Sequence, residues 1–306
     1  MKPLALSTMF AQQDRFEDGA AFARYAAEAG YDAIEISHST LEPKLQQILD
    51  ANILPVASVH QPAPYVRMPD GRGNSHANLA AIDEHERDTA VAYARASIAW
   101  AARIGAGRVI VHLGQVSDVA EQFEEELEMR RMFDSGRADE PRLAELRHEA
   151  IERRARDADP YLAAARRSLL ELVATAQPHN IAIGLENRYH YHEIPQPLEY
   201  EPLLDGIALS DAGYWHDTGH AEVLHRLGFN DRHQWLDLHS KRCIGAHLHD
   251  VLGIGDHRAP GNGDVDWGYI TEGLKHLPSY TLEINQHQAD DTVRSAPAFL
   301  ESVGLL

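Results

Sequence analysis

Short apolar runs typical of buried β-strands recur along the chain, and longer stretches with helical periodicity lie between them. Eight segments have the strand pattern: 3–10, 31–37, 54–60, 108–114, 181–187, 213–218, 243–250 and 280–285. Residues 16–30 and 88–105 have the helical pattern, and each ends in a glycine, the residue type that most often follows a helix. The alternation predicts parallel strands connected by helices.

Eight alternations favour an α/β fold, a (β/α)₈ TIM barrel that forms one domain over residues 1–306, because this fold needs about 250 residues. A doubly wound open sheet is the competing architecture, but no glycine-rich phosphate-binding turn follows the first predicted strand.

The excess length lies at 115–159, between the fourth strand and a helical stretch at 160–176. Two sets of apolar residues there have helical spacing: Val116, Val119, Phe123 and Leu127, then Leu143, Leu146, Ala150 and Ile151. We therefore predict a helical hairpin inserted in the loop after the fourth strand. A lid or an oligomer contact is a minor alternative for it, which leaves a homo-oligomer open.

Composition and charge limit the classes of partner that the protein can bind. The chain has 28 Lys and Arg against 47 Asp and Glu, a formal net charge of −19, which repels nucleic-acid phosphates. No apolar run approaches the ~20 residues of a membrane span, and MKPLALSTMF reaches polar residues too early for a signal peptide. The one cysteine, Cys243, cannot form a disulfide within the chain. We expect a cytoplasmic protein without a nucleic-acid or membrane partner.

Most predicted strands end in a residue suited to metal binding or acid–base catalysis. The six residues are His60, His112, Glu186, Asp217, His247 and Glu283. In a TIM barrel these strand ends meet at one mouth, where active sites lie. One such histidine would more often be a packed core residue, and one such carboxylate a helix cap, but six on six strands are hard to explain in that way. Carboxylates buried together repel one another, and a divalent cation removes the repulsion.

Strand parity refines this set in the segment WHDTGH. Because alternate residues of a strand face opposite sides, Asp217 pointing inward makes His216 point outward, toward the helices. The Thr-Gly pair would then form the turn that returns His220 over the mouth. On the seventh strand His247 and His249 share a face, and His247 lies deeper, so it is the better ligand.

The motifs GLEN, DTGH, HLHD and PGNGDVDW, in this order and on these predicted strands, resemble the xylose-isomerase-like TIM-barrel superfamily. This superfamily contains sugar and sugar-phosphate isomerases and epimerases, and also endonuclease IV. The resemblance runs from GYDAIEIS to LEIN and leaves out the insertion at 115–159. It implies an isomerase or epimerase of a carbohydrate that transfers a proton next to a carbonyl.

The resemblance also implies a ligand set. In the isomerases and epimerases, four residues after strands five to eight hold one divalent metal, and they match Glu186, Asp217, His247 and Glu283. Three carboxylates and one imidazole suit Mn²⁺, Mg²⁺, Co²⁺ or Zn²⁺. Such a metal polarises a carbonyl, so that Glu186 and Glu283 can act as the acid–base pair.

The resemblance also suggests roles for four further residues near the mouth. The turn histidine, His220, and a basic residue before the Pro-Gly turn, Arg258, match residues that contact substrate in this group. His60 and His112 match zinc ligands of endonuclease IV, while several sugar enzymes keep similar histidines for hydroxyl groups. We favour substrate contact for both histidines, with a second metal site as the alternative.

Other functions stay open. A zinc-dependent phosphodiesterase of the endonuclease IV type would use an Asp-x-His after strand seven, but this chain reads DHRAPG at 256–261. That broken spacing and the acidic charge weigh against a site with three zinc ions. A dehydratase or lyase acting on a sugar acid or cyclitol, and a non-catalytic sugar-binding barrel, are further alternatives. In PGNGDVDW, Asp266 is best interpreted as a helix N-cap.

Overall fold

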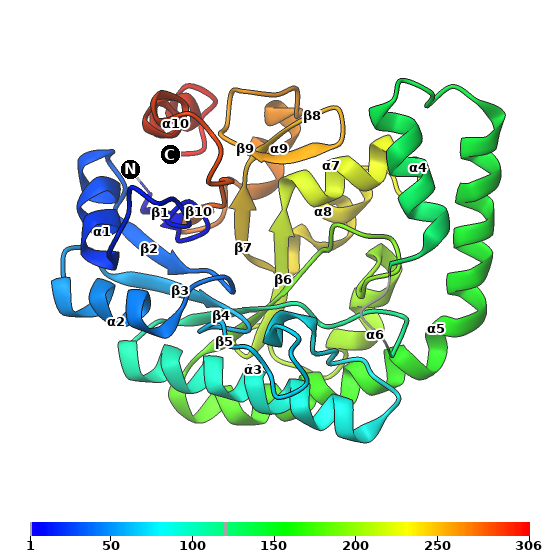
Figure 1. The fold of residues 1–306 in the computed structure, drawn as a ribbon, viewed down its shortest axis with the longest axis horizontal. Helices are drawn as coiled ribbons and strands as arrows, with labels where there is room; N and C mark the ends of the chain where they lie inside the picture. Colours follow the sequence, from blue (N-terminus) through cyan, green and yellow to red (C-terminus); the bar gives the residue numbers. More distant parts are fainter. Residues whose placement is uncertain (1, 119–121) are drawn as a thin grey trace.

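The structure, a computed structural model, describes residues 2–118 and 122–306, and it confirms the predicted barrel (Figure 1). Eight parallel strands close in the order β1-β10-β7-β6-β5-β4-β3-β2. Their bounds are Leu4–Ser7 (β1), Ala33–Ile36 (β2), Val56–His60 (β3), Arg108–Val111 (β4), Ala182–Glu186 (β5), Ala212–Asp217 (β6), Cys243–Leu248 (β7) and Tyr280–Leu282 (β10). A two-stranded antiparallel sheet, β8 (Asp250–Leu252) and β9 (Gly255–Arg258), follows β7.

Helices surround the barrel in Figure 1. They are α1 (Gly19–Glu28), α2 (Glu42–Ala51), α3 (Glu84–Ile104), α4 (Glu124–Asp134), α5 (Pro141–Ala176), α6 (Tyr200–Leu204), α7 (Thr218–Arg226), α8 (Gln234–His239), α9 (Trp267–Leu274) and α10 (Asp290–Ser302). Short 3₁₀ turns lie at Asn74–His76, Gln177–His179, Pro197–Glu199 and Ser240–Arg242. None of the helices in the described ranges combines the length and the apolar character needed to cross a membrane.

Local sequence explains where two of these helices begin and end. Asp18 and Asp83 cap α1 and α3, since their side chains accept hydrogen bonds from backbone N–H groups of the first turn. The predicted glycines follow: Gly30 and Gly105 have φ of 88° and 76°, a left-handed conformation that glycine adopts without strain.

The segment after β4 contains the two predicted helices, packed against each other, but with different bounds. The first helix, α4, begins at Glu124, later than its apolar spacing suggested, and Val119 lies outside the described residues. Val116 is not helical, because its N–H bonds to the carbonyl of His192 at 2.9 Å and ties it to the loop after β5. The second helix, α5, is 36 residues long and runs without interruption through residue 159 into the predicted barrel helix.

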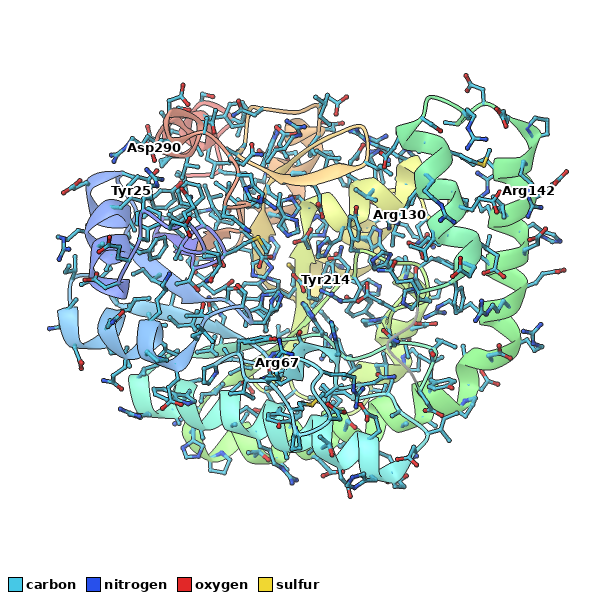
Figure 2. The ribbon with its side chains drawn as sticks, in the orientation of Figure 1. Tyr25, Arg67, Arg130, Arg142, Tyr214 and Asp290 are labelled. Atoms are coloured by element: carbon cyan, nitrogen blue, oxygen red, sulfur yellow. The ribbon has the colours of Figure 1, made fainter. Side chains whose placement is uncertain are left out.

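Helices α4 and α5 lie side by side next to the barrel (Figure 1). Arg130 of α4 lies on the side of that helix that faces the barrel (Figure 2). This arrangement brings α4 close to the loop after β5, which also carries residues of the mouth.

Below the mouth, the indole of Trp215 fills the barrel between β5 and β7. Its ring lies against Gly184 and Gly245, on the two strands that flank β6, where a Cβ atom would overlap the ring. The same parity that points Trp215 inward points Asp217 into the mouth. The outward residue between them, His216, is fully buried and contacts the Tyr214 hydroxyl at 2.5 Å, which agrees with its predicted outward position.

Candidate active site

The four predicted metal ligands meet at the carboxyl ends of their strands. Glu186 ends β5, Asp217 ends β6, His247 lies in β7 and Glu283 follows β10, and one ligand atom from each lies within 4.8 Å of the others. The Nδ1 atom of His247 is 2.5 Å from Glu186 Oε1, 3.2 Å from Glu283 Oε2 and 3.8 Å from Asp217 Oδ2. One imidazole nitrogen therefore faces three carboxylates.

This cluster suits a divalent cation. All four side chains are at most 1% exposed, and buried carboxylates this close together need a cation or many donors to offset their repulsion. Glu283 Oε1 is buried and makes no hydrogen bond with any residue that the structure describes. Three carboxylates and one imidazole form the oxygen-rich donor set that Mn²⁺, Mg²⁺, Co²⁺ and Zn²⁺ accept.

The charge state of the two glutamates is set by the histidines around them. Burial alone would raise the pKa of Glu186, but His60 and His247 outweigh it and hold that pKa well below its usual range. Burial acts in the same sense on Glu283, where His247 and His60 again lower the pKa. Both side chains are therefore carboxylates at neutral pH.

A fifth acid, Glu35 on β2, lies behind His247, and sequence reasoning did not identify it. Its Oε1 is 2.9 Å from His247 Nε2, and its Oε2 accepts a 2.6 Å hydrogen bond from the Ser58 hydroxyl. A carboxylate on the second nitrogen of a metal-ligating histidine fixes its tautomer and its orientation. The signal in the sequence was a single acid inside the apolar strand AIEI.

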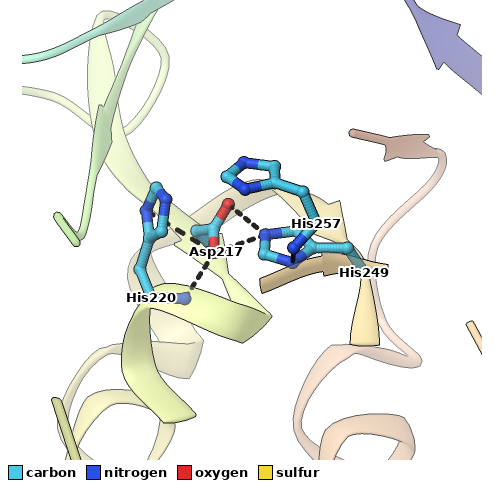
Figure 3. Close-up of side chains that lie close together, drawn as sticks. All are labelled: Asp217, His220, His249 and His257. Carbon is cyan, nitrogen blue, oxygen red and sulfur yellow. Dashed lines mark hydrogen bonds and ion pairs between the residues drawn. The ribbon is translucent and has the colours of Figure 1, made fainter. Parts of the chain in front are cut away.

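Asp217 is held from several directions (Figure 3). It caps α7 by accepting a 2.7 Å hydrogen bond from the backbone N–H of His220. His249 Nε2 lies 2.9 and 3.0 Å from its two oxygens. The backbone N–H of His257 donates to His249 Nδ1 at 2.9 Å. Because Nδ1 accepts this bond, the ring proton of His249 is on Nε2, which donates it to Asp217. His249, which its later position along the chain placed nearer the rim than His247, is fully buried.

His60 and His112 lie beside the ligands, at the ends of β3 and β4. His60 Nε2 is 2.6 Å from His112 Nε2, and His112 Nε2 is 2.8 Å from Glu186 Oε2. Burial, the largest single effect, lowers the pKa of His60, but Glu186 and Glu283 together raise it to about 9. Burial, with nearby Arg188 and His60, instead holds the pKa of His112 well below its usual range.

Arg188 is a second residue that sequence reasoning missed, although it stands only two positions after Glu186, just past the end of β5. Its Nη1 donates to Glu186 Oε2 at 2.7 Å, and its Nη2 donates to Glu193 Oε1 at 3.0 Å. The guanidinium thus stabilises the ionised form of Glu186 through Oε2, while His247 contacts Oε1.

A cavity of about 400 Å³ opens above the ligands. His60, His112 and His220 line it, together with Asp256 and His257. Arg258 is not among its lining residues, and its buried Nε has no hydrogen-bond partner in the described part of the chain. Its role in substrate binding stays a prediction.

The DHRAPG segment brings more ligand atoms to the mouth than its spacing suggested. Asp256 Oδ2 is 3.0 Å from His257 Nδ1 and 3.8 Å from His220 Nε2. The broken Asp-x-His spacing therefore does not keep Asp256 and His257 away from His220, because the β8–β9 hairpin brings both residues to it.

The PGNGDVDW segment has a structural role. The buried carboxylate of Asp250 accepts hydrogen bonds from the N–H groups of Gly261 and Val265 and from the indole of Trp267. Asp266 caps α9 by accepting from Tyr269 N at 3.1 Å, which confirms its interpretation as an N-cap.

Residues 23–303 match the xylose isomerase-like TIM barrel family, and the chain belongs to this family. A D-tagatose 3-epimerase-like protein shares 21% identity over 99% of this chain and 98% of its own, with a TM-score of 0.67. The 3-keto-D-glucoside 4-epimerase of E. coli shares 17% identity over 99% and 100% of the two chains, with a TM-score of 0.67. An L-ribulose 3-epimerase shares 14% over 99% and 94%, with a TM-score of 0.66. At these identities the likeness establishes the fold. No curated protein matches the chain.

Proposed function

We propose that the protein is a divalent-metal-dependent isomerase or epimerase of a sugar or sugar derivative, which transfers a proton at the carbon next to a carbonyl. The observation that carries this proposal is the buried cluster of Glu186, Asp217, His247 and Glu283 below an open cavity of about 400 Å³. The structures named as sugar epimerases that share this fold support it. A non-catalytic sugar-binding barrel would not need two ionised glutamates at this position.

Glu186, Asp217, His247 and Glu283 would hold one divalent cation, which, when bound, polarises the sugar carbonyl and makes the neighbouring C–H group more acidic. Glu35 would hold the His247 imidazole in place from behind. His60, His112 and His220 line the cavity and would bind sugar hydroxyls.

The two glutamates are placed symmetrically but differ in basicity. In each glutamate one carboxylate oxygen faces His247, and the second carboxylate oxygen lies 3.4 Å from a nitrogen of His60. Glu186 Oε2 also accepts a 2.7 Å hydrogen bond from Arg188 and lies 2.8 Å from His112 Nε2, whereas Glu283 Oε1 makes no hydrogen bond with any described residue and has only the more distant His60 beside it. Donors stabilise a carboxylate and weaken it as a base. Glu283 therefore removes the proton, and Glu186, the stronger acid when protonated, returns one.

The test is proton NMR in D₂O with Mn²⁺-loaded protein and a panel of ketoses. Deuterium should enter one carbon of a substrate that is turned over. Glu283→Gln keeps the shape of the side chain but removes the base, so turnover should fall by the ~10²–10⁴-fold typical of general acid–base catalysis. Metal content is measured alongside, because the same residue is a proposed ligand.

Glu222→Gln is the matched control. Glu222 is also buried, but it bonds to Arg226 and Arg232 on the outer side of the barrel, so its loss should leave turnover unchanged. The proposal fails if Glu283→Gln retains full turnover. It also fails if a substrate that is turned over shows neither solvent exchange nor a primary isotope effect at the carbon next to its carbonyl.

One observation favours a second function, a zinc-dependent phosphodiesterase of the endonuclease IV type. His60, His112 and Glu186 converge within 3.4 Å, and His220, Asp256 and His257 converge beside them, which gives ligands for further metals. Against it, the Arg188 guanidinium already occupies Glu186 Oε2 and the net charge is −19. Three zinc ions per chain and nicking of an abasic duplex would move this function into first place.

A further inference from the structure

A second cavity, of about 190 Å³, adjoins the mouth cavity on the side of β3, β4 and β5. The two share five lining residues: Ser75, His76, His112, Arg188 and His190. Because His112 and Arg188 both contact Glu186, the second cavity begins within one side chain of the proposed ligands. A molecule bound in the mouth could extend into it.

The second cavity is polar. Beyond the shared residues, hydrogen-bonding side chains line it: Gln61, Asn78, Gln115, Gln122, His192 and Glu193. Its other described lining residues are small, namely Pro62, Ala77 and Gly114. Amides and imidazoles both donate and accept hydrogen bonds, which suits groups that do the same, such as hydroxyls.

The lining is held in place by its own bonds. The Asn78 amide donates to the carbonyl of Ser117 at 2.6 Å and accepts from Gln115 N at 3.0 Å. Gln122 Nε2 is 2.8 Å from His190 Nε2. These bonds connect the loops after β3, β4 and β5, so the cavity is preformed, as binding sites for small molecules usually are.

The charges in this cavity are already matched. Arg188 is bound by Glu186 at 2.7 Å and by Glu193 at 3.0 Å. His190 Nδ1 lies 2.8 Å from the buried carboxylate of Glu126. Phosphate sites usually offer uncompensated arginines or backbone N–H groups. A phosphate here would instead meet the carboxylate of Glu193.

Resting on the proposed function, we infer that the second cavity is a subsite for a neutral, polyhydroxylated group attached to the reacting sugar. The reacting carbonyl end would lie in the mouth, and the attached group, such as a second sugar ring, would lie past His112 and Arg188. The substrate class is then a glycosylated keto-sugar and not a phosphorylated one.

The test measures binding without turnover. Calorimetry on Mn²⁺-loaded protein compares D-fructose, D-fructose 6-phosphate and two neutral glucosides of fructose, turanose and isomaltulose. At least one glucoside should bind about tenfold more tightly than D-fructose, the gain expected from one or two added hydrogen bonds, and the phosphate ester should show no gain.

Gln122→Trp fills the second cavity from an exposed position and should lower the ratio of glucoside to fructose affinity about tenfold. Gln177→Trp is the matched control, because Gln177 is also exposed but precedes β5 at the opposite end of the barrel. Tighter binding of the phosphate ester, equal binding of glucosides and fructose, or an unchanged ratio in Gln122→Trp would overturn the inference. A gain in binding without proton exchange would refute the proposed reaction and leave the subsite standing.

Discussion

Glu35→Gln tests whether the carboxylate that contacts His247 strengthens binding of the proposed metal. Glu35 is fully buried, and its Oε1 lies 2.9 Å from His247 Nε2, while His247 Nδ1 faces the three carboxylates. The glutamine oxygen can still accept the imidazole N–H, so the substitution keeps the shape and one neutral hydrogen bond. What it removes is the negative charge that makes the imidazole a stronger donor to a cation.

The expected magnitude follows from that single contact. Loss of a group that bonds to a metal-ligating histidine typically lowers metal affinity about 10–100-fold, which corresponds to about 1.4–2.8 kcal/mol. A hydrogen bond to a charged group contributes roughly 1.5–3 kcal/mol, so the two estimates agree. The contact is shielded from solvent on all sides, so salt should change the effect little.

The assay is calorimetric titration of metal-free protein with Mn²⁺, with thermal melting as a check of the fold. Ser58→Ala removes the 2.6 Å bond to Glu35 Oε2 but keeps the charge, so it should weaken binding by roughly threefold or less. Glu222→Gln, a buried carboxylate away from the mouth, should leave affinity unchanged. A folded Glu35→Gln protein with wild-type affinity would refute the reasoning, because His247 would then need no support.

Three further outcomes follow from the structure. Removing metal with a chelator should lower the melting temperature, since a ligand at about 1,000 times its Kd stabilises the folded state by about 4 kcal/mol; an unchanged melt would contradict a tight site. Gly245→Ala should cost about 1–3 kcal/mol in urea unfolding by pressing on the Trp215 ring, and Trp215→Phe should reduce that cost; additive losses would contradict the contact. Burial lowers the pKa of His216 to about 3, so between pH 6.5 and 3 only the unfolded chain binds this proton and stability falls as pH falls. In metal-free protein, His216→Phe should therefore reduce the slope of the free energy of unfolding against pH by up to about 1.4 kcal/mol per pH unit. Equal slopes in the wild-type and His216→Phe proteins would contradict a buried, neutral His216.

Strand and helix periodicity was sufficient to predict the barrel, because eight apolar runs separated by amphipathic helices fit few other architectures. The meeting of Glu186, Asp217, His247 and Glu283 followed from one rule, that parallel strand ends share a mouth. Their roles as metal ligands stay predictions.

The sequence could not show which side chains contact one another across the barrel. Glu35 reaches His247 from a strand 212 positions away in the chain, a contact that depends on barrel closure and not on local pattern. Periodicity also failed at the start of the insertion. Apolar spacing cannot distinguish a helix from an extended segment that packs on a loop, and Val116 belongs to the second kind.

Helices α4 and α5 brace the loop after β5. The buried carboxylate of Glu126 on α4 accepts from Arg130 and from the N–H of Tyr191, and it lies 2.8 Å from His190 Nδ1. Arg154 on α5 donates to the Glu193 carbonyl at 3.1 Å.

These contacts fix the stretch of chain that carries Arg188 and Glu193. Arg188 is the donor that distinguishes Glu186 from Glu283, and Glu193 holds Arg188 in place. A barrel lacking α4 could still bring the four proposed ligands together, but Arg188 would be held less firmly against Glu186, and the difference in basicity on which the proposed base and acid roles depend would shrink. None of the described residues of α4 and α5 lines either cavity, so these helices support the proposed active site from outside, through the loop that carries Arg188.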